Sequence, residues 1–294
     1  MTLASSPPRA VRQLLGTSRP LSWINTAYPF AAAYLLAGGG LDVALVVGTV
    51  FFLVPYNLLM YGVNDVFDHD SDLRNPRKGG VEGIVLDRRV HRLTLWSAAL
   101  LPLPFLAVLL PQGGVVAGLV LLVVLAAVVG YSAPGVRLKE RPVLDSLTSS
   151  THFVGPAAYG LALTGAPLGL TAAASLIAFF LWGMASHAFG AVQDVRPDRE
   201  AGIGSIATVL GAARTVRLAL VLYAVAGLVM LATGGPAALA GLLALPYLVS
   251  IWPFRAVSEE QSGRAHRGWR RFLVLNLVTG FLLTQLLIVL VLTR

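Results

Sequence analysis

The sequence predicts an all-α protein that crosses a membrane many times, and three observations support this fold class. Of the 294 residues, 56% are hydrophobic and only 12% are charged, and the mean hydropathy is +0.75. A soluble domain carries about twice that charged fraction. Nine stretches are each apolar over roughly the 20 residues that a helix needs to span a bilayer. The basic residues are concentrated between alternate stretches.

The nine predicted spans follow one another with mostly short connections. Turns rich in Gly and Pro, such as Gly38-Gly39-Gly40 and Gly234-Gly235-Pro236, separate several of them and predict helical hairpins. In chain order the predicted spans are 21–38, 43–64, 93–110, 113–131, 146–164, 169–191, 213–233, 235–252 and 272–292.

The basic residues support nine spans and give them an orientation. Of the 22 Lys and Arg residues, all but Arg294 lie on one predicted side of the membrane. They occupy the N-terminal segment and the loops after spans two, four, six and eight, with the adjoining helix ends. Basic loops face the cytoplasm. We therefore expect an integral protein of the cell membrane, with its N-terminus in the cytoplasm and its C-terminus outside. The N-terminal segment has no apolar core followed by a small-residue cleavage site, so we interpret it as a cytoplasmic lead-in and not as a signal peptide.

Composition also excludes several functions. The net charge of +8 belongs to the predicted loops and forms no basic face with stacking groups, so no nucleic-acid partner is expected. Cysteine is absent, which excludes a disulfide framework and thiol chemistry. Membrane lipid is an expected partner, because Arg264, Arg267, Arg270 and Arg271 precede the last span as anchors for anionic headgroups. The sequence does not indicate an oligomeric state.

Two acidic clusters lie at the ends of apolar stretches, where carboxylates are costly and mark functional sites by default. The first follows span two. Its Asp65, Asp68 and Asp72 are spaced i, i+3 and i+7, which places them on one stripe of a helix, and Asn64 precedes them. Asp70 points off this stripe, so we expect it to be solvated.

The second acidic cluster follows span six. Asp194 and Asp198 are one helical turn apart, although Pro197 between them makes a regular helix less certain. Gly202 permits a tight turn behind them. Both clusters begin with an amide followed by Asp. This parallel suggests one membrane-embedded domain, 1–294, with two pseudo-repeated halves at about 20–131 and 146–252 and a last helix at 272–292.

The chemistry of these clusters points to magnesium. Clustered carboxylates repel one another unless cations lie among them, and hard oxygen ligands suit Mg²⁺. Mg²⁺ beside a membrane is suited to gripping a diphosphate. The predicted metal-binding and catalytic residues are Asp65, Asp68, Asp72, Asp194 and Asp198. Residues predicted to contact diphosphate oxygens are Asn64, Arg77, Lys78, Arg137, Lys139 and Arg199. The basic members of this set also fit a simpler role as determinants of topology.

Three ordered motifs resemble those of the UbiA superfamily of intramembrane prenyltransferases. They are Asn64-Asp65-x-x-Asp68-x-x-x-Asp72, the loop from Tyr131 to Lys139, and Asp194-x-x-x-Asp198-x-x-x-Gly202. The resemblance covers nearly the whole chain. It implies a ring of nine helices around a central cavity, and transfer of a prenyl group from a prenyl diphosphate with Mg²⁺ bound by the two aspartate motifs.

A narrower resemblance indicates the substrates. Segments 18–30, 74–83, 144–153 and 180–186 are similar to actinobacterial lycopene elongases. This likeness implies addition of a C5 unit from dimethylallyl diphosphate to the ends of lycopene, or of a related carotenoid, in the formation of C50 carotenoids.

Two alternatives remain open at this stage. One is a prenyltransferase that acts on an aromatic quinone or haem precursor. The other is a cation-coupled transporter, since intramembrane carboxylates and internal repeats occur there, but such a protein would hold its acids near the middle of the bilayer.

Overall fold

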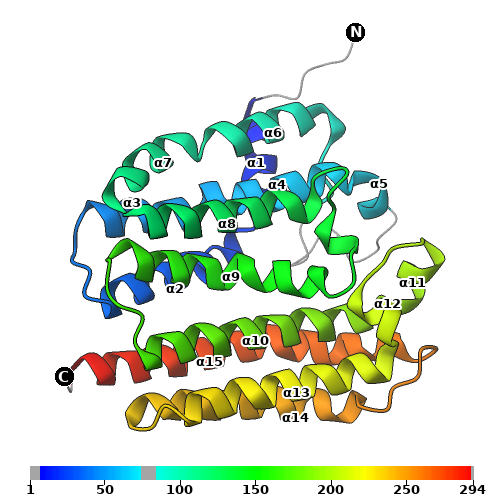
Figure 1. Cartoon of the computed structure of the whole chain (residues 1–294). Coiled ribbons are helices and arrows are strands. Elements are labelled where there is room, and N and C mark those ends of the chain that lie inside the picture. The colour runs from blue at the N-terminus through cyan, green and yellow to red at the C-terminus, as the bar shows by residue number, and fades with distance from the viewer. Residues whose placement is uncertain (1–6, 74–83, 293–294) are drawn as a thin grey trace. The chain divides into compact units, whose positions relative to one another are not determined.

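The computed structural model describes residues 7–73 and 84–292, and every regular element within these ranges is helical (Figure 1). The all-α prediction is therefore confirmed for the described residues. The chain divides into two compact units. Unit 1 comprises residues 1–137 and 155–166, and unit 2 comprises residues 138–154 and 167–294.

Unit 1 contains the first eight α-helices, three short 3₁₀ helices and the second half of α9. Its elements are α1 (Pro7–Thr17), η1 (Pro20–Ser22), α2 (Ile24–Leu36), α3 (Val43–Leu53), α4 (Pro55–Phe67), α5 (His69–Asp72), η2 (Arg88–Val90), α6 (His91–Leu100), α7 (Leu103–Leu109), η3 (Leu110–Gln112) and α8 (Val115–Ser132).

Unit 2 begins after Arg137 and includes the first half of α9. Its elements are η4 (Leu138–Glu140), α9 (Leu144–Leu163), α10 (Leu170–Val192), α11 (Val195–Glu200), α12 (Ile206–Leu210), α13 (Ala212–Leu231), η5 (Pro236–Ala244), α14 (Leu245–Ile251), η6 (Trp252–Phe254), η7 (Ser262–Ala265) and α15 (His266–Leu292).

Seven helical segments of the described chain are long and apolar enough to cross a membrane. They are Val43–Phe67, Arg88–Gln112, Val115–Ser132, Leu170–Val192, Ala212–Leu231, Pro236–Phe254 and Ser262–Leu292. Each overlaps one of the nine predicted spans. The other two predicted spans correspond to α2, which has only 13 residues, and to α9, whose first half is rich in Ser and Thr. Length in one case and polarity in the other explain why these two helices fall short of the seven.

Prolines interrupt several of the predicted spans. Pro55 begins α4 directly after α3, and Pro102 separates α6 from α7. Pro246 and Pro253 lie in the first turns of α14 and η6. Proline has no backbone N–H and fits best in the first turn of a helix, so each of these apolar stretches becomes two shorter helices at that point. Pro29 and Pro156, by contrast, lie inside α2 and α9.

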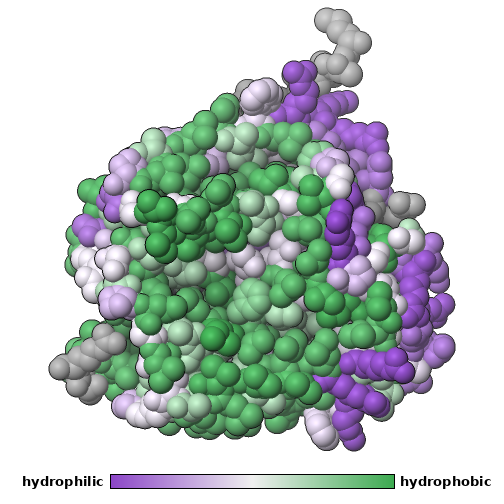
Figure 2. All heavy atoms as spheres, in the orientation of Figure 1, coloured by the Kyte–Doolittle hydropathy of each residue, from purple (hydrophilic) through white to green (hydrophobic). Residues whose placement is uncertain are grey.

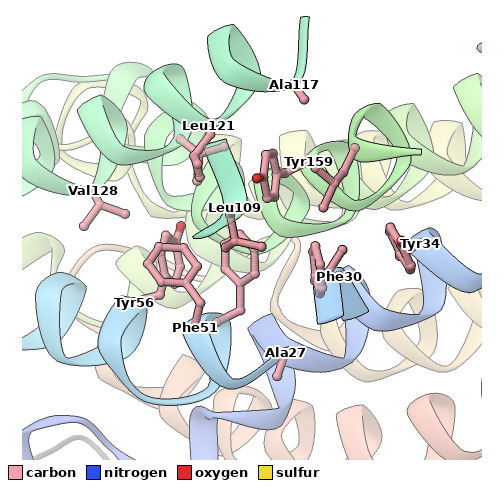
Figure 3. Packing of buried hydrophobic residues seen from close by; sticks show 14 of the residues in the cluster. Ala27, Phe30, Tyr34, Phe51, Tyr56, Leu109, Ala117, Leu121, Val128 and Tyr159 are labelled. Atoms are coloured by element: carbon pink, nitrogen blue, oxygen red, sulfur yellow. The ribbon is translucent and has the colours of Figure 1, made fainter. Parts of the chain in front are cut away.

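An aromatic core holds unit 1 together (Figure 3). The ring of Phe30 on α2 lies 5.1 Å from that of Phe52 on α3, and the Phe52 ring lies 5.0 Å from that of Tyr56 on α4. A Cβ at Gly48 would lie only 2.1 Å from the Phe30 ring, so glycine is what lets α2 and α3 approach this closely. Tyr159 on α9 completes the cluster.

Two buried polar side chains, Asn57 and Thr26, link three helices of the unit 1 core. The Asn57 amide donates to the Thr26 hydroxyl at 2.8 Å and to the carbonyl oxygen of Phe52 at 2.8 Å. Both side chains are fully buried. A buried amide needs such partners where water is absent, so these bonds fix the register of α2 against the break between α3 and α4.

Unit 2 has its own core on α10, α13, α14 and α15. The rings of Tyr223 and Tyr247 stack at 5.3 Å. The Tyr223 hydroxyl lies 2.9 Å from Ser186 Oγ, and the Tyr247 hydroxyl donates to Asn276 Oδ1 at 2.9 Å. Each tyrosine therefore packs its ring in the core and satisfies its hydroxyl on a neighbouring helix.

Much of the exterior is apolar. Hydrophobic residues cover most of the face drawn in Figure 2. Large apolar side chains such as Val115 and Leu277 are more than two-thirds exposed, at 80% and 73%. An apolar surface of this extent is suited to lipid and not to water.

Candidate active site

The first acidic cluster lies where α4 gives way to α5. Asp68 is the residue between the two helices, and its φ of −100° and ψ of 4° end α4. Backbone bonds from Asp68 N to Asn64 O (2.9 Å) and from Asp72 N to Asp68 O (2.8 Å) preserve helical spacing across this junction. Asp65 is fully buried and Asp72 is 7% exposed, whereas the Asp70 side chain is 76% exposed. Asp70 is thus much more exposed than Asp65 and Asp72, as its position off the stripe predicts.

Arg19 balances the most deeply buried of these carboxylates. Its Nη2 donates to Asp65 Oδ1 at 3.1 Å, and its guanidinium lies over the Tyr61 ring, 4.1 Å from the centroid. A buried carboxylate is stable only with such a partner. The Arg19 backbone adopts the left-handed conformation, with φ 51° and ψ 73°, which is unfavourable for a residue with a Cβ. Sequence reasoning did not assign Arg19 to the site, although its position as the cation directly before the first span was a usable signal.

Arg137 pairs with the second acid of the cluster. Its Nη2 lies 3.4 Å from Asp68 Oδ1. Arg137 also has a left-handed backbone, with φ 40°, and it follows Gly135 at φ 84°. The Ser132 hydroxyl, in the same loop, donates to the amide oxygen of Asn64 at 2.9 Å. Unit 1 therefore brings two predicted diphosphate contacts, Asn64 and Arg137, together with the first acidic cluster.

The other predicted contacts are distributed differently. Arg77 and Lys78 lie outside the described residues. Lys139 lies in η4, at the start of unit 2. The loop from Tyr131 to Lys139 is thus divided between the two units after Arg137.

The second acidic cluster occupies a short helix. Asp194 is the N-cap residue of α11, and Asp198 N donates to Asp194 O at 2.9 Å, so the two acids are one helical turn apart as predicted. Pro197 lies in the first turn of α11, where its missing N–H would have no helical partner in any case. Gly202 has φ 70°, which confirms the predicted tight turn.

The polar residues next to the second cluster are held by protein partners. His266 Nδ1 lies 2.8 Å from Gln193 Oε1. Arg199 forms an ion pair with Glu259 and donates from Nη2 to the carbonyl oxygen of Thr208 at 2.6 Å. These contacts fasten α11 to α12 and to the loop after η6. Contact between Arg199 and a diphosphate would require this arrangement to open.

Unit 2 contains a further buried acid, Asp145, whose structural role the sequence did not predict. Asp145, fully buried near the start of α9, accepts hydrogen bonds from the backbone N–H groups of Ser146 and Ile206, both at 2.8 Å. The Ser146 hydroxyl lies 3.1 Å from His187 Nδ1 on α10. These bonds connect α9 to α10 and α12.

The donor set of the first cluster suits magnesium. In the described part of the chain, no three His, Asp or Glu side chains are already grouped to hold one metal ion. The cluster nevertheless binds cationic groups, because the carboxylates of Asp65 and Asp68 each accept a hydrogen bond from an arginine. Carboxylate oxygens that pair with cations are also the hard ligands that Mg²⁺ takes. Metal binding by the five aspartates stays a prediction.

Comparison with known proteins identifies the family. Residues 26–289 match the UbiA prenyltransferase family. The chain belongs to this family. It is 54% identical over 282 residues to the C(50) beta-cyclic carotenoids biosynthesis protein of Dietzia sp. (strain CQ4), covering 96% of the chain and 65% of that protein. It is 49% identical over 278 residues to the lycopene elongase/hydratase of Corynebacterium glutamicum, covering 95% of the chain and 97% of that protein.

The fold agrees with the family. A UbiA homologue from Archaeoglobus fulgidus, solved with DMAPP and Mg²⁺ bound, superimposes with a TM-score of 0.65 at 19% identity, covering 91% of this chain and 98% of that one. The chain is therefore an integral membrane protein of the UbiA prenyltransferase family, as its motifs predict. Membership in this family overturns the alternative of a cation-coupled transporter. The chain spans just under two-thirds of the length of the Dietzia relative.

Proposed function

We propose that this UbiA-family prenyltransferase transfers a dimethylallyl group from its diphosphate to the ends of lycopene, or of a related carotenoid, in the formation of C50 carotenoids. The acceptor is suggested by the Corynebacterium and Dietzia relatives, which match over 95% and 96% of the chain. The observation that carries the chemistry is the buried first acidic cluster, with Asp65 and Asp68 each paired to an arginine.

We further propose the architecture that the sequence predicts. α2 and α9 would join the seven long apolar segments as spans, which gives nine helices around a central cavity in one domain with two related halves. The N-terminus would be cytoplasmic and the C-terminus outside. Both acidic clusters would then lie at the cytoplasmic ends of their spans, where a soluble diphosphate can reach them.

Each part of the site has a distinct role in this proposal. Five aspartates would hold Mg²⁺: Asp65, Asp68, Asp72, Asp194 and Asp198. When bound, Mg²⁺ would offset the charge that develops on the departing diphosphate. Asn64, Arg137 and Lys139 would contact the diphosphate oxygens left over, together with Arg77 and Lys78, whereas Arg199 would keep its ion pair with Glu259. A guanidinium suits this role because it donates two parallel hydrogen bonds to oxygens of one phosphate.

The bond changes follow from the substrates. The carbon–oxygen bond of the donor breaks, and its electron pair stays on the diphosphate. A terminal double bond of the acceptor supplies the electron pair of the new carbon–carbon bond. The resulting tertiary cation loses a proton to form an alkene, or takes up water and then loses a proton. An apolar chamber protects both cations from premature capture by water.

Expression of the protein in a lycopene-producing bacterium tests the proposal. We expect pigments heavier than lycopene by one or two C5 units, with or without added water, by mass spectrometry. The Asp65→Asn variant, inserted in the membrane to the same level, serves as the inactive control. Unchanged lycopene beside a newly prenylated quinone would instead assign the enzyme to aromatic acceptors.

A further inference from the structure

An apolar groove opens on the surface of unit 1, and none of the acidic residues of the first cluster lines it. It has a volume of about 610 Å³, is lined by α1, the α3–α4 junction and the α6–α7 segment, and contains only two polar side chains, Ser18 and Ser97. Leu15 and Trp96 on its walls are 47% and 61% exposed, so the groove faces outward. This volume falls within the range of pockets that hold small organic molecules.

The two helices that form its walls, α1 and α6, share buried neighbours. Ala10 of α1 and Val90, directly before α6, belong to one cluster of buried residues. Leu14 of α1 and Leu95 of α6 both pack against a second cluster, formed by Leu58, Val63 and Ala98. These shared neighbours place the start of α6 near α1, and both helices line the groove.

Two arginines, Arg12 and Arg92, lie next to residues that line the groove. Arg12 lies three residues before Leu15, and Arg92 lies four residues before Trp96, so each precedes a groove residue on its own helix by about one turn. Both are exposed, and neither forms an ion pair or hydrogen bond with any residue that the structure describes. Two neighbouring cations differ, since Arg9 pairs with Asp87 and Arg88 with Asp70.

We propose that this groove binds one acyl chain of an anionic phospholipid, whose headgroup phosphate is held by Arg12 and Arg92. The hydrocarbon chain fits walls that are almost entirely apolar, and guanidinium groups recognise phosphate through paired hydrogen bonds. Trp96, with its apolar ring and polar N–H, suits the boundary between chain and headgroup. A carotenoid hydrocarbon would leave both arginines without a partner, and so would the uncharged end of a second apolar helix.

Fluorescence of Trp96 tests this binding in lipid nanodiscs. Phospholipids brominated on the acyl chain quench a nearby tryptophan, and subtraction of the Trp96→Phe signal isolates Trp96 from the other tryptophans. Brominated phosphatidylglycerol should half-quench Trp96 at a mole fraction roughly tenfold lower than brominated phosphatidylcholine, given the attraction of about two basic side chains to one anionic headgroup. Equal quenching by both lipids would overturn the proposal.

Charge variants then assign the preference to the two arginines. Arg12→Gln with Arg92→Gln should make the two lipids equivalent, whereas Arg12→Lys with Arg92→Lys should keep part of the preference. The matched control, Arg267→Gln with Arg270→Gln, removes the same charge from exposed positions outside the groove and should keep all of it. Far-UV circular dichroism verifies that each variant remains folded. Equal loss in the control, displacement of the brominated lipid by equimolar lycopene, or burial of Trp96 in a dimer would each contradict the proposal.

Discussion

The two acidic clusters look alike in the sequence but are held in different ways. In unit 1, Asp65 and Asp68 pair with Arg19 and Arg137, which come from distant loops with left-handed backbones. In unit 2, the nearest arginine in the sequence, Arg199, is instead bound to Glu259 and to a backbone carbonyl. Arg19 and Arg137 thus pair with acids of the first cluster, whereas Arg199 fastens α11 to its neighbours.

This difference shows that proximity in sequence is a poor guide to the partner of a buried acid. In unit 1 the partners of Asp65 and Asp68 are supplied by turns distant in the sequence. Both unit 1 turns bear the cost of an unfavourable backbone for that purpose, about 1–2 kcal/mol each.

Loss of an acid from either cluster should have the largest effect. Asp65→Asn and Asp194→Asn should each reduce turnover by at least about 10³-fold, since each is predicted to hold Mg²⁺. Pigment mass in lycopene-producing cells and turnover in isolated membranes measure this, and chelation of divalent metal should have the same effect. Asp70→Asn, which alters an exposed acid off the stripe, should stay active. Full activity of Asp65→Asn would refute the metal assignment.

Arg19→Gln should produce the next largest effect, and it acts on stability. Asp65 would remain buried without its cation, which costs roughly 3 kcal/mol of unfolding free energy. Denaturant unfolding in detergent measures the loss. The double variant Arg19→Gln with Asp65→Asn should recover much of it, because the unpaired charge is then gone. If the two single losses simply add, Arg19 does not act through Asp65.

Arg137→Gln and Arg199→Gln should differ in their effect on the KM for the prenyl diphosphate. Arg137 lies with the first cluster, so its loss should raise KM for the prenyl diphosphate by about tenfold. Arg199→Gln should leave that KM unchanged and cost about 1 kcal/mol of stability, because its ion pair is partly exposed. An equal rise in KM for both variants would show that Arg199 also reaches the diphosphate, as its sequence position suggests.

Gly202→Ala should have the smallest effect. The residue after α11 has φ 70°, where a Cβ costs about 1 kcal/mol. A small fall in the midpoint of thermal unfolding, with turnover preserved, is the expected result. Gly263→Ala is the matched control, because a Cβ there meets no atom within 4 Å and its backbone is not left-handed. A neutral Gly202→Ala would mean that the turn relaxes without strain.

Much of this organisation follows from sequence pattern. Apolar length predicts the seven long segments, and i, i+3, i+7 spacing predicts which acids of the first cluster are buried. The breaks at Pro55 and Pro102 were not predicted, because a hydropathy window averages over a single proline. Arg19 was missed for another reason. Its link to Asp65 joins residues 46 positions apart, and such a contact depends on how the helices pack.

The tether between Arg19 and Asp65 has a practical consequence for protein engineering. The segment before α2 is anchored on the buried carboxylate of Asp65, so a fusion tag or deletion that displaces residues 16–20 would disturb the first acidic cluster. Purification tags are therefore better placed after α15, since no described residue at the end of that helix forms an ion pair with the first acidic cluster.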